Sequence, residues 1–293
     1  MTVSAQAGSL AIARTLTALR MRVRDWRADG QTVALVPTMG ALHKGHGTLF
    51  DAARRAADRV IVSVFVNPTQ FGPNEDFAAY PRDESRDAAF CDSHGVDLLF
   101  APGVAEMYPE GFATSVHVAG LSDGLCGAFR PGHFDGVATV VAKLLIQAAP
   151  DSAFFGEKDF QQLCIIRRAA RDLDLGAAII GVPTVREADG LAVSSRNAYL
   201  SAEERAVAPA LYRVLGDAAA GIAGGAQVPV VLAGARDELL GAGFRAVDYV
   251  EYVDAATLRP LTGFDPARPA RLLAAAHLGR ARLIDNLAVG AQK

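Results

Sequence analysis

The stretch Pro37–His46, with the sequence PTMGALHKGH, most constrains what this chain can fold into. It follows the apolar run Val33–Val36, which predicts a short buried strand, and it precedes a helical pattern that includes Leu49. His43 and His46 are three residues apart, so we expect both imidazoles on one face of the first helical turn. Free amides and the positive end of a helix attract anions. The pattern therefore predicts a place for a polyphosphate at the end of a strand.

Two plainer interpretations of the histidine pair stay open at this point. Paired histidines at this spacing are often ordinary surface residues, and they can also form half of a zinc site. The remaining histidines form no second cluster with cysteine, so the zinc interpretation is weak. The three cysteines have no paired spacing, which is typical of a reducing compartment.

Composition restricts the classes of protein to consider. A chain of 293 residues predicts one large or two modest domains, and a hydrophobic fraction of 51% is ample for a core. The net charge of −3 does not favour nucleic acid as a partner. Residues 1–8 lack the pattern of a signal peptide, and the longest apolar runs are far shorter than a membrane span. We therefore expect a soluble, cytoplasmic protein with no nucleic-acid or membrane partner.

Alternating strand and helix patterns fill the first part of the chain. Continuous apolar strands between helices predict an α/β fold, with a Rossmann-like parallel sheet covered by helices on both faces. Ligands of such sheets bind beyond the carboxyl ends of the strands. The predicted strands are 33–36, 60–66, 97–100, 153–155 and 178–182, and the predicted helices are 9–28, 45–57, 83–94, 134–148 and 159–172.

The pattern changes after residue 200. Helices are predicted at 202–220 and 228–242, followed by strands at 246–253, 271–277 and 281–288. The alternation of apolar and polar residues in 247–252 predicts a half-exposed antiparallel sheet. We therefore predict a Rossmann-like domain over residues 1–185 and a smaller C-terminal α+β domain over residues 186–293.

Three further motifs follow the ends of predicted strands, the third within the segment Pro183–Arg196 that comes after strand 178–182. Gly156–Asp159 opens a helix, and its Lys158 is one of only four lysines in a chain with 25 arginines. Gln162 stands four residues after Lys158 and can face the same side of the helix. Asn67–Gln70 places a neutral amide after the second strand, and Val193–Asn197 combines two hydroxyls with a guanidinium, a set that suits phosphate. Each motif alone also fits an ordinary polar turn, but their convergence favours a ligand site.

The motifs together resemble the pantothenate synthetase (pantoate–β-alanine ligase) family of the H-x-G-H nucleotidyltransferase superfamily. The resemblance covers most of the chain, and the combination of motifs is highly specific. They stand in this order: PTMGALHxGH, FVNPxQF, YPR, HFxGVxTVV, FFGEKDxQQ, GVPTVRExDGLA and SSRNxYL.

This resemblance implies a two-step reaction. The pantoate carboxylate attacks the α-phosphate of ATP to give pantoyl adenylate and pyrophosphate, and the β-alanine amine then releases AMP and gives pantothenate, a precursor of coenzyme A. It also implies that the first domain binds nucleotide and pantoate, that the second covers the active site, and that the protein is a homodimer that uses Mg²⁺.

The resemblance assigns residues as well. His46 is the implied proton donor, with His43 and Lys158 also catalytic, and Asp87 is a weak candidate for a carboxylate near Mg²⁺. Gln70 would bind pantoate and β-alanine, and Gln162 would bind pantoate. The implied ATP-binding residues are Met39, Gly40, Ala41, Leu42, His43, Lys44, Gly45, His46, Gly156, Glu157, Lys158, Asp159, Val185, Val193, Ser194, Ser195 and Arg196.

Two departures from the family pattern affect these expectations. Gly47 replaces a bulkier residue, so we expect a looser helix start, and Val193 replaces Met or Leu but keeps an apolar contact for the nucleotide. Two other functions remain to be weighed: a nucleotidyltransferase that stops after nucleotide transfer, and a module that senses ATP without turnover. The intact histidine pair and Lys158 argue against the sensing module, and the two glutamines argue against the simple transferase.

Overall fold

The computed structural model describes residues 10–73, 75 and 77–290, which group into two compact units. The first unit comprises Met1–Val118, Arg130–Gly156 and Ile165–Val182. The second comprises Ala119–Phe129, Glu157–Cys164 and Pro183–Lys293. Two short segments before residue 183 thus group with the C-terminal part of the chain. The predicted division into domains at 185/186 stays a prediction about independently folding parts.

A six-stranded parallel sheet forms the centre of the first unit. Its spatial order is β1-β4-β3-β2-β5-β6. The central pair aligns Leu35 of β2 with Ile61 of β3, and Leu35 also lies opposite Ala153 of β5. The strands are β1 (Ala11–Ala13), β2 (Val33–Thr38), β3 (Arg59–Val64), β4 (Leu98–Phe100), β5 (Ser152–Gly156) and β6 (Ala178–Val182).

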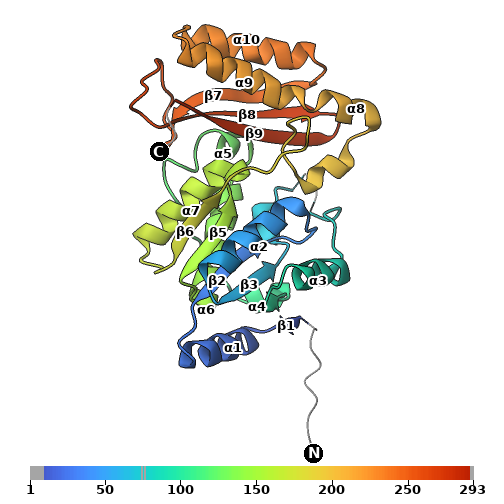
Figure 1. The fold of residues 1–293 in the computed structure, drawn as a ribbon, viewed down its shortest axis with the longest axis vertical. Coiled ribbons are helices and arrows are strands. Elements are labelled where there is room, and N and C mark those ends of the chain that lie inside the picture. The colour runs from blue at the N-terminus through green and yellow to red at the C-terminus, as the bar shows by residue number, and fades with distance from the viewer. Residues whose placement is uncertain (1–9, 74, 76, 291–293) are drawn as a thin grey trace, which may run out of the picture. The chain divides into compact units, whose positions relative to one another are not determined.

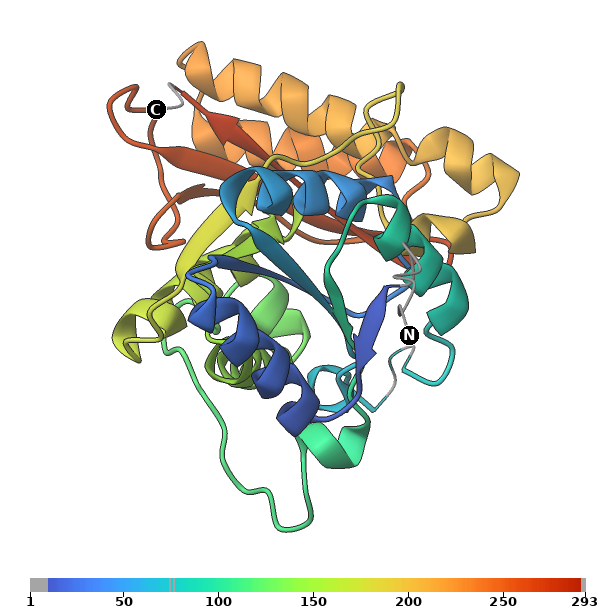
Figure 2. The same cartoon turned by 60° about the horizontal axis from the view of Figure 1, so that its bottom comes forward.

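Helices cover both faces of this sheet. Figure 2 shows α2 on one side of the strands, and α1 with α6 on the other. Apolar residues of α2 and α3, among them Phe50 and Cys91, pack on Val36 and Val62 of the sheet. The helices with residues in the first unit are α1 (Leu16–Ala28), α2 (Lys44–Ala56), α3 (Glu84–Ser93), α4 (Val104–Met107), α6 (His133–Ala148) and α7 (Phe160–Asp172), with a 3₁₀ turn η1 (Pro68–Gln70). The start of α7, up to Cys164, groups with the second unit.

The second unit is built on a three-stranded antiparallel sheet of β7 (Ala246–Asp254), β8 (Ala270–Leu278) and β9 (Ala281–Val289). The helices α9 (Ala210–Ala223) and α10 (Val228–Gly241) lie side by side over one face of this sheet (Figure 1). Their apolar side chains form a continuous core with Leu272 and Tyr252. This unit also contains α5 (Cys126–Phe129), α8 (Ala202–Val207) and the 3₁₀ turns η2 (Glu157–Asp159) and η3 (Ser195–Tyr199).

The structure confirms the predicted fold class and corrects the limits of several elements. The predicted helix 9–28 is wrong in its first part: Ala11–Ala13 form the edge strand β1, and the helix begins only after Thr15, whose side chain caps it. Residue 9 itself lies outside the described residues. The predicted helix 202–220 is two helices, because Pro209 has no backbone N–H to continue the first one.

Helices in the described part of the chain are too short or too polar to cross a membrane.

We expect Leu35→Ala to lower the free energy of unfolding by about 2–5 kcal/mol, the usual cost of a cavity at a fully buried leucine. Leu35 is 0% exposed and lies at the centre of the sheet. The matched control is Ile146→Ala, because Ile146 is 58% exposed and its loss should change stability by about 0.5 kcal/mol or less. Urea unfolding of both variants gives the comparison, and equal costs would contradict this description of the core.

Candidate functional residues in each unit

The histidine pair lies where β2 gives way to α2. His43 has an extended backbone and forms the N-cap of α2, and His46 occupies the third helical position. The two imidazole rings lie side by side, with centroids 4.1 Å apart and planes tilted by 36°. The spacing of the residues thus places both rings at the amino end of the helix, as predicted from the sequence.

Backbone contacts decide which ring nitrogen carries the proton. The Gly45 N–H donates to Nδ1 of His43 at 3.1 Å, and the His43 N–H donates to Nδ1 of His46 at 3.3 Å. A ring nitrogen that accepts a hydrogen bond carries no proton, so the neutral form of each ring has its proton on Nε2. Each Nε2 is therefore a donor, and donors at a helix N-terminus suit phosphate oxygens.

The loop before the histidines is held by the buried carboxylate of Asp87, on α3. Its oxygens accept the N–H groups of Ala41 at 3.0 Å and of Leu42 at 2.8 Å. Burial raises the pKa of Asp87, while these two hydrogen bonds oppose the rise. Gly40 has a φ of +79°, and a Cβ there would lie 2.7 Å from the Asp87 carboxylate. Only glycine therefore allows this close approach.

The departure at Gly47 is compensated by His94, which follows α3. A Cβ on Gly47 would lie 2.7 Å from Nε2 of His94. The His94 ring also packs on Phe90, with ring centroids 4.2 Å apart, and on Phe50. In the structure α2 begins at Lys44, and Gly47 is buried in it. The looser helix start stays a prediction.

Gln70 lies at the end of η1, and its side-chain amide is well oriented. The amide of Asn67 donates to Oε1 of Gln70 at 3.1 Å, and Nε2 of Gln70 donates to Sδ of Met39 at 2.9 Å. His133, at the start of α6, lies 2.7 Å from the Gln70 carbonyl oxygen. A Cβ on Gly136 would lie 2.4 Å from the Thr69 carbonyl oxygen, so this glycine lets α6 approach η1 closely. The structure thus brings Met39 and Gln70 together within the first unit.

Lys158 and its neighbours belong to the second unit. Lys158 is the middle residue of η2, its side chain is largely buried, and its ammonium lies 4.0 Å from the Asp159 carboxylate. The two glutamines that follow differ sharply. Gln161 is buried and bonds to the backbone at Cys126, Leu121 and Gly124, whereas Gln162 is half-buried. Gln161 therefore has a structural role, and the binding of pantoate by Gln162 stays a prediction.

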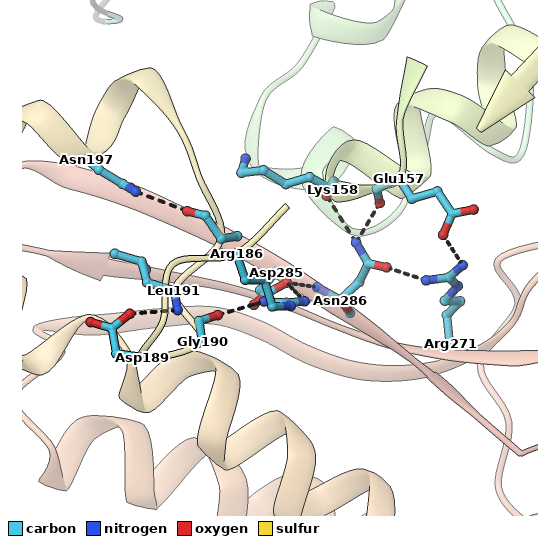
Figure 3. A network of polar contacts seen from close by, with 11 residues as sticks. Glu157, Lys158, Arg186, Asp189, Gly190, Leu191, Asn197, Arg271, Asp285 and Asn286 are labelled. Atoms are coloured by element: carbon cyan, nitrogen blue, oxygen red, sulfur yellow. Dashed lines mark hydrogen bonds and ion pairs between the residues drawn. The ribbon is translucent and has the colours of Figure 1, made fainter. Parts of the chain in front are cut away.

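Another part of the second unit carries Val185 and the segment 193–196. The Val193 N–H donates to the Val185 carbonyl oxygen at 2.9 Å, which closes a narrow loop. Arg186 anchors this loop, because its guanidinium makes two hydrogen bonds to the Asp285 carboxylate, at 2.6 and 2.8 Å (Figure 3). Ser194 caps η3 by accepting the Arg196 N–H. The structure thus brings together the predicted residues Val185 and Val193.

A protein-held magnesium site is not supported by the side chains. No group of three or more His, Cys, Asp or Glu residues that could hold a metal occurs within residues 10–73, 75 and 77–290. Both oxygens of Asp87 already accept backbone N–H groups. The residues present do not fit a dedicated magnesium cage. That Asp87 lies near Mg²⁺ stays a prediction.

Comparison with known proteins identifies the family. The profile of the Pantoate-beta-alanine ligase family matches residues 11–288. The chain belongs to this family. It is 62% identical to a pantothenate synthetase of Paramagnetospirillum magneticum over 95% of this chain and 97% of that protein, and 59% identical to one of Rhodospirillum rubrum over 96% and 99%.

Solved structures agree with this assignment. A pantothenate synthetase from Thermus thermophilus is 50% identical, with a TM-score of 0.89 over 96% of this chain and all of that one. A pantoate-beta-alanine ligase from Francisella tularensis, in complex with Beta-gamma ATP and Beta-alanine, is 33% identical, with a TM-score of 0.80 over 95% of this chain and 97% of that one. The present chain is therefore a ligase with the fold of these enzymes.

Sequence reasoning missed the anchoring roles of three residues, one of which, Asp87, it names only as a weak candidate near Mg²⁺. Asn67, Asp87 and Arg186 fix the three loops that carry predicted ligand contacts. A signal was present for Arg186, because Asp285 and Asn286 stand side by side between apolar residues of the predicted strand 281–288. Two neighbouring polar residues in such a strand call for buried partners.

We expect Asp87→Asn to slow adenylate formation by roughly 10- to 100-fold, because a small misplacement of catalytic groups is costly. The amide keeps one acceptor oxygen, but its NH₂ group faces a backbone N–H that has then lost its partner. The control is Asp83→Asn, since Asp83 caps the same helix and asparagine caps equally well. Single-turnover kinetics measures both, and a wild-type rate for Asp87→Asn would show that the loop does not depend on this carboxylate.

Proposed function

We propose that this chain joins pantoate to β-alanine at the expense of ATP and gives pantothenate, AMP and pyrophosphate. The observation that carries this proposal is the paired histidine geometry at the N-terminus of α2, in a chain that belongs to the ligase family from residue 11 to 288. The first step forms pantoyl adenylate as the pantoate carboxylate attacks the α-phosphate. The amine of β-alanine then attacks the acyl carbon and displaces AMP.

The histidines stabilise charge in the first step. As the α-phosphate is attacked, negative charge grows on its oxygens and on the departing pyrophosphate. Donors that are already oriented stabilise this charge without a cost of reorganisation. We assign this role to the Nε2–H groups of His43 and His46, with His46 as the proton donor. Their fixed Nδ1 contacts support this assignment, because they leave the proton on Nε2.

The remaining predicted residues are assigned by the chemistry that they offer. We assign Lys158 to the ATP phosphates, and Val185, Val193 and Ser194–Arg196 to the nucleotide. Gln70, with an amide oriented by Asn67, is assigned to pantoate and β-alanine, and Gln162 to pantoate. The loop Met39–Leu42 contributes backbone N–H groups and the Met39 side chain.

Three further proposals concern the conditions of the reaction. Mg²⁺ enters with ATP as part of the substrate, since a nucleotide brings its own phosphate ligands for the ion. The enzyme works in the cytoplasm; its cysteines at 91, 126 and 164 are buried and form no disulfide. It acts as a homodimer, which family resemblance supports and sedimentation velocity can test.

Isotope exchange tests the proposed function. If a pantoyl adenylate forms, labelled pyrophosphate should enter ATP when pantoate and Mg²⁺ are present and β-alanine is absent. The adenylate is formed reversibly in that mixture, and only the amine can complete the reaction. Omission of pantoate is the control and should abolish exchange. Exchange that strictly requires β-alanine would refute the adenylate mechanism.

We expect Lys158→Arg to keep stability but to lower the rate of adenylate formation roughly tenfold or more, because the forked guanidinium does not replace a compact ammonium. Lys158→Ala should lose about 10²–10³-fold, the usual cost of one charge-stabilising group. The apparent affinity for β-alanine should not change. Lys143→Arg is the matched control, since Lys143 lies over the Phe112 ring in the first unit. Wild-type adenylation by the Lys158→Arg enzyme would exclude the phosphate role.

A further inference from the structure

The buried side chain of Asn286, on β9, holds the turn that carries Lys158. Its Nδ2 donates to the carbonyl oxygens of Glu157 at 2.9 Å and of Lys158 at 3.0 Å (Figure 3). Its Oδ1 accepts from the Arg271 guanidinium at 2.9 Å. Carbonyl oxygens can only accept and a guanidinium can only donate, so only one orientation of the Asn286 amide satisfies all three contacts.

Arg271, on β8, makes one contact before Lys158 in the chain and one contact after it. Its guanidinium lies 2.8 Å from the Glu157 carboxylate and stacks over the Phe160 ring, with Cζ 4.2 Å from the ring centroid. Glu157 directly precedes Lys158, and Phe160 begins the helix that follows. The side chain of Arg271 is largely buried, so solvent screens this ion pair less than one at the surface. The turn is thus held before and after Lys158.

We propose that Asn286 and Arg271 are positioning residues for Lys158, so that the antiparallel sheet, and not β5, fixes where the lysine lies. This inference rests on the phosphate role proposed for Lys158. Figure 3 shows the Lys158 ammonium pointing away from Asn286, so Asn286 holds the backbone of this turn and not the ammonium group.

The division of the chain into two units supports the proposal that the antiparallel sheet, and not β5, fixes Lys158. Gly156, the last residue of β5, belongs to the first unit, whereas Glu157 and Lys158 belong to the second. Gly156 pairs with Val182 of β6, but no atom of a neighbour would lie within 4 Å of a Cβ at Gly156, so no side-chain packing at this residue fixes the turn that follows. The backbone position of Lys158 therefore depends on the contacts with β8 and β9.

The decisive variant is Asn286→Asp. It keeps the shape and the oxygen that accepts from Arg271, but it replaces the donor by an oxygen that faces two carbonyl oxygens. We expect adenylate formation at saturating ATP to fall on the order of 10- to 100-fold, since a displacement of about 1 Å has this effect. The affinity for β-alanine should not change. Asn286→Ala removes the donor without adding charge, and it should show the same loss in rate. It replaces Asn286→Asp in the test if the Asp variant does not fold.

A double-mutant cycle separates positioning from a general structural role. If Asn286 acts through Lys158, Asn286→Asp should lower the rate of adenylate formation by less than about twofold in a Lys158→Ala background. These slow rates are measured over hours with labelled ATP. An equal loss in both backgrounds would overturn the proposal. Failure of the proposed function is distinguishable, because the wild-type enzyme would then show no pantoate-dependent pyrophosphate exchange.

Arg271→Met should slow adenylate formation in the same way, through loss of the Glu157 and Asn286 contacts. Its matched control is Arg268→Met. This variant also removes an ion pair of the second unit, because the Arg268 guanidinium lies 2.8 Å from the Asp254 carboxylate. The control should keep the wild-type rate. Equal rates for the two variants would show that Arg271 has no special link to Lys158.

Discussion

The buried ion pair between Arg186 and Asp285 anchors the loop of the second unit that carries the predicted ligand residues Val185 and Val193. Asp285 is 3% exposed at its side chain, and an unpaired carboxylate at such a position would cost about 3–5 kcal/mol. One of its oxygens also accepts the backbone N–H of Asn286 at 2.7 Å. Two consecutive residues of β9 therefore hold two segments: Asp285 holds the loop of Val185 and Val193, and Asn286 holds the turn of Lys158.

The first unit uses the same physical device in a different element. Asp87 directs its buried carboxylate at the backbone of the loop before His43, and not at a side chain. Its desolvation, which raises its pKa, is offset in part by two backbone donors. In both units a buried carboxylate fixes a loop. Asp87 accepts from the main chain of its loop, and Asp285 accepts from Arg186, which anchors the other loop.

The fold was largely predictable because continuous apolar strands and amphipathic helices leave a clear pattern. Edge strand β1 was not predictable, because three residues are too few to show an alternation of apolar and polar side chains. Pro209 explains the division of the predicted helix 202–220, and closer attention to it would have found the break. The histidine pair was found because its geometry is local, within one helical turn. Asn286 was missed because its partner Glu157 stands 129 residues away in the chain.

An anchoring residue stands next to a predicted ligand residue in two places, and sequence alone leaves the choice between the two neighbours open. Gln161 makes three backbone contacts in its own unit, and Gln162 beside it is half-buried. Glu157 pairs with Arg271, and the next residue is Lys158. An anchored residue fixes the backbone of its neighbour at little extra entropic cost, because one ordered peptide serves both. Chemical type cannot separate two adjacent glutamines; only their buried partners can.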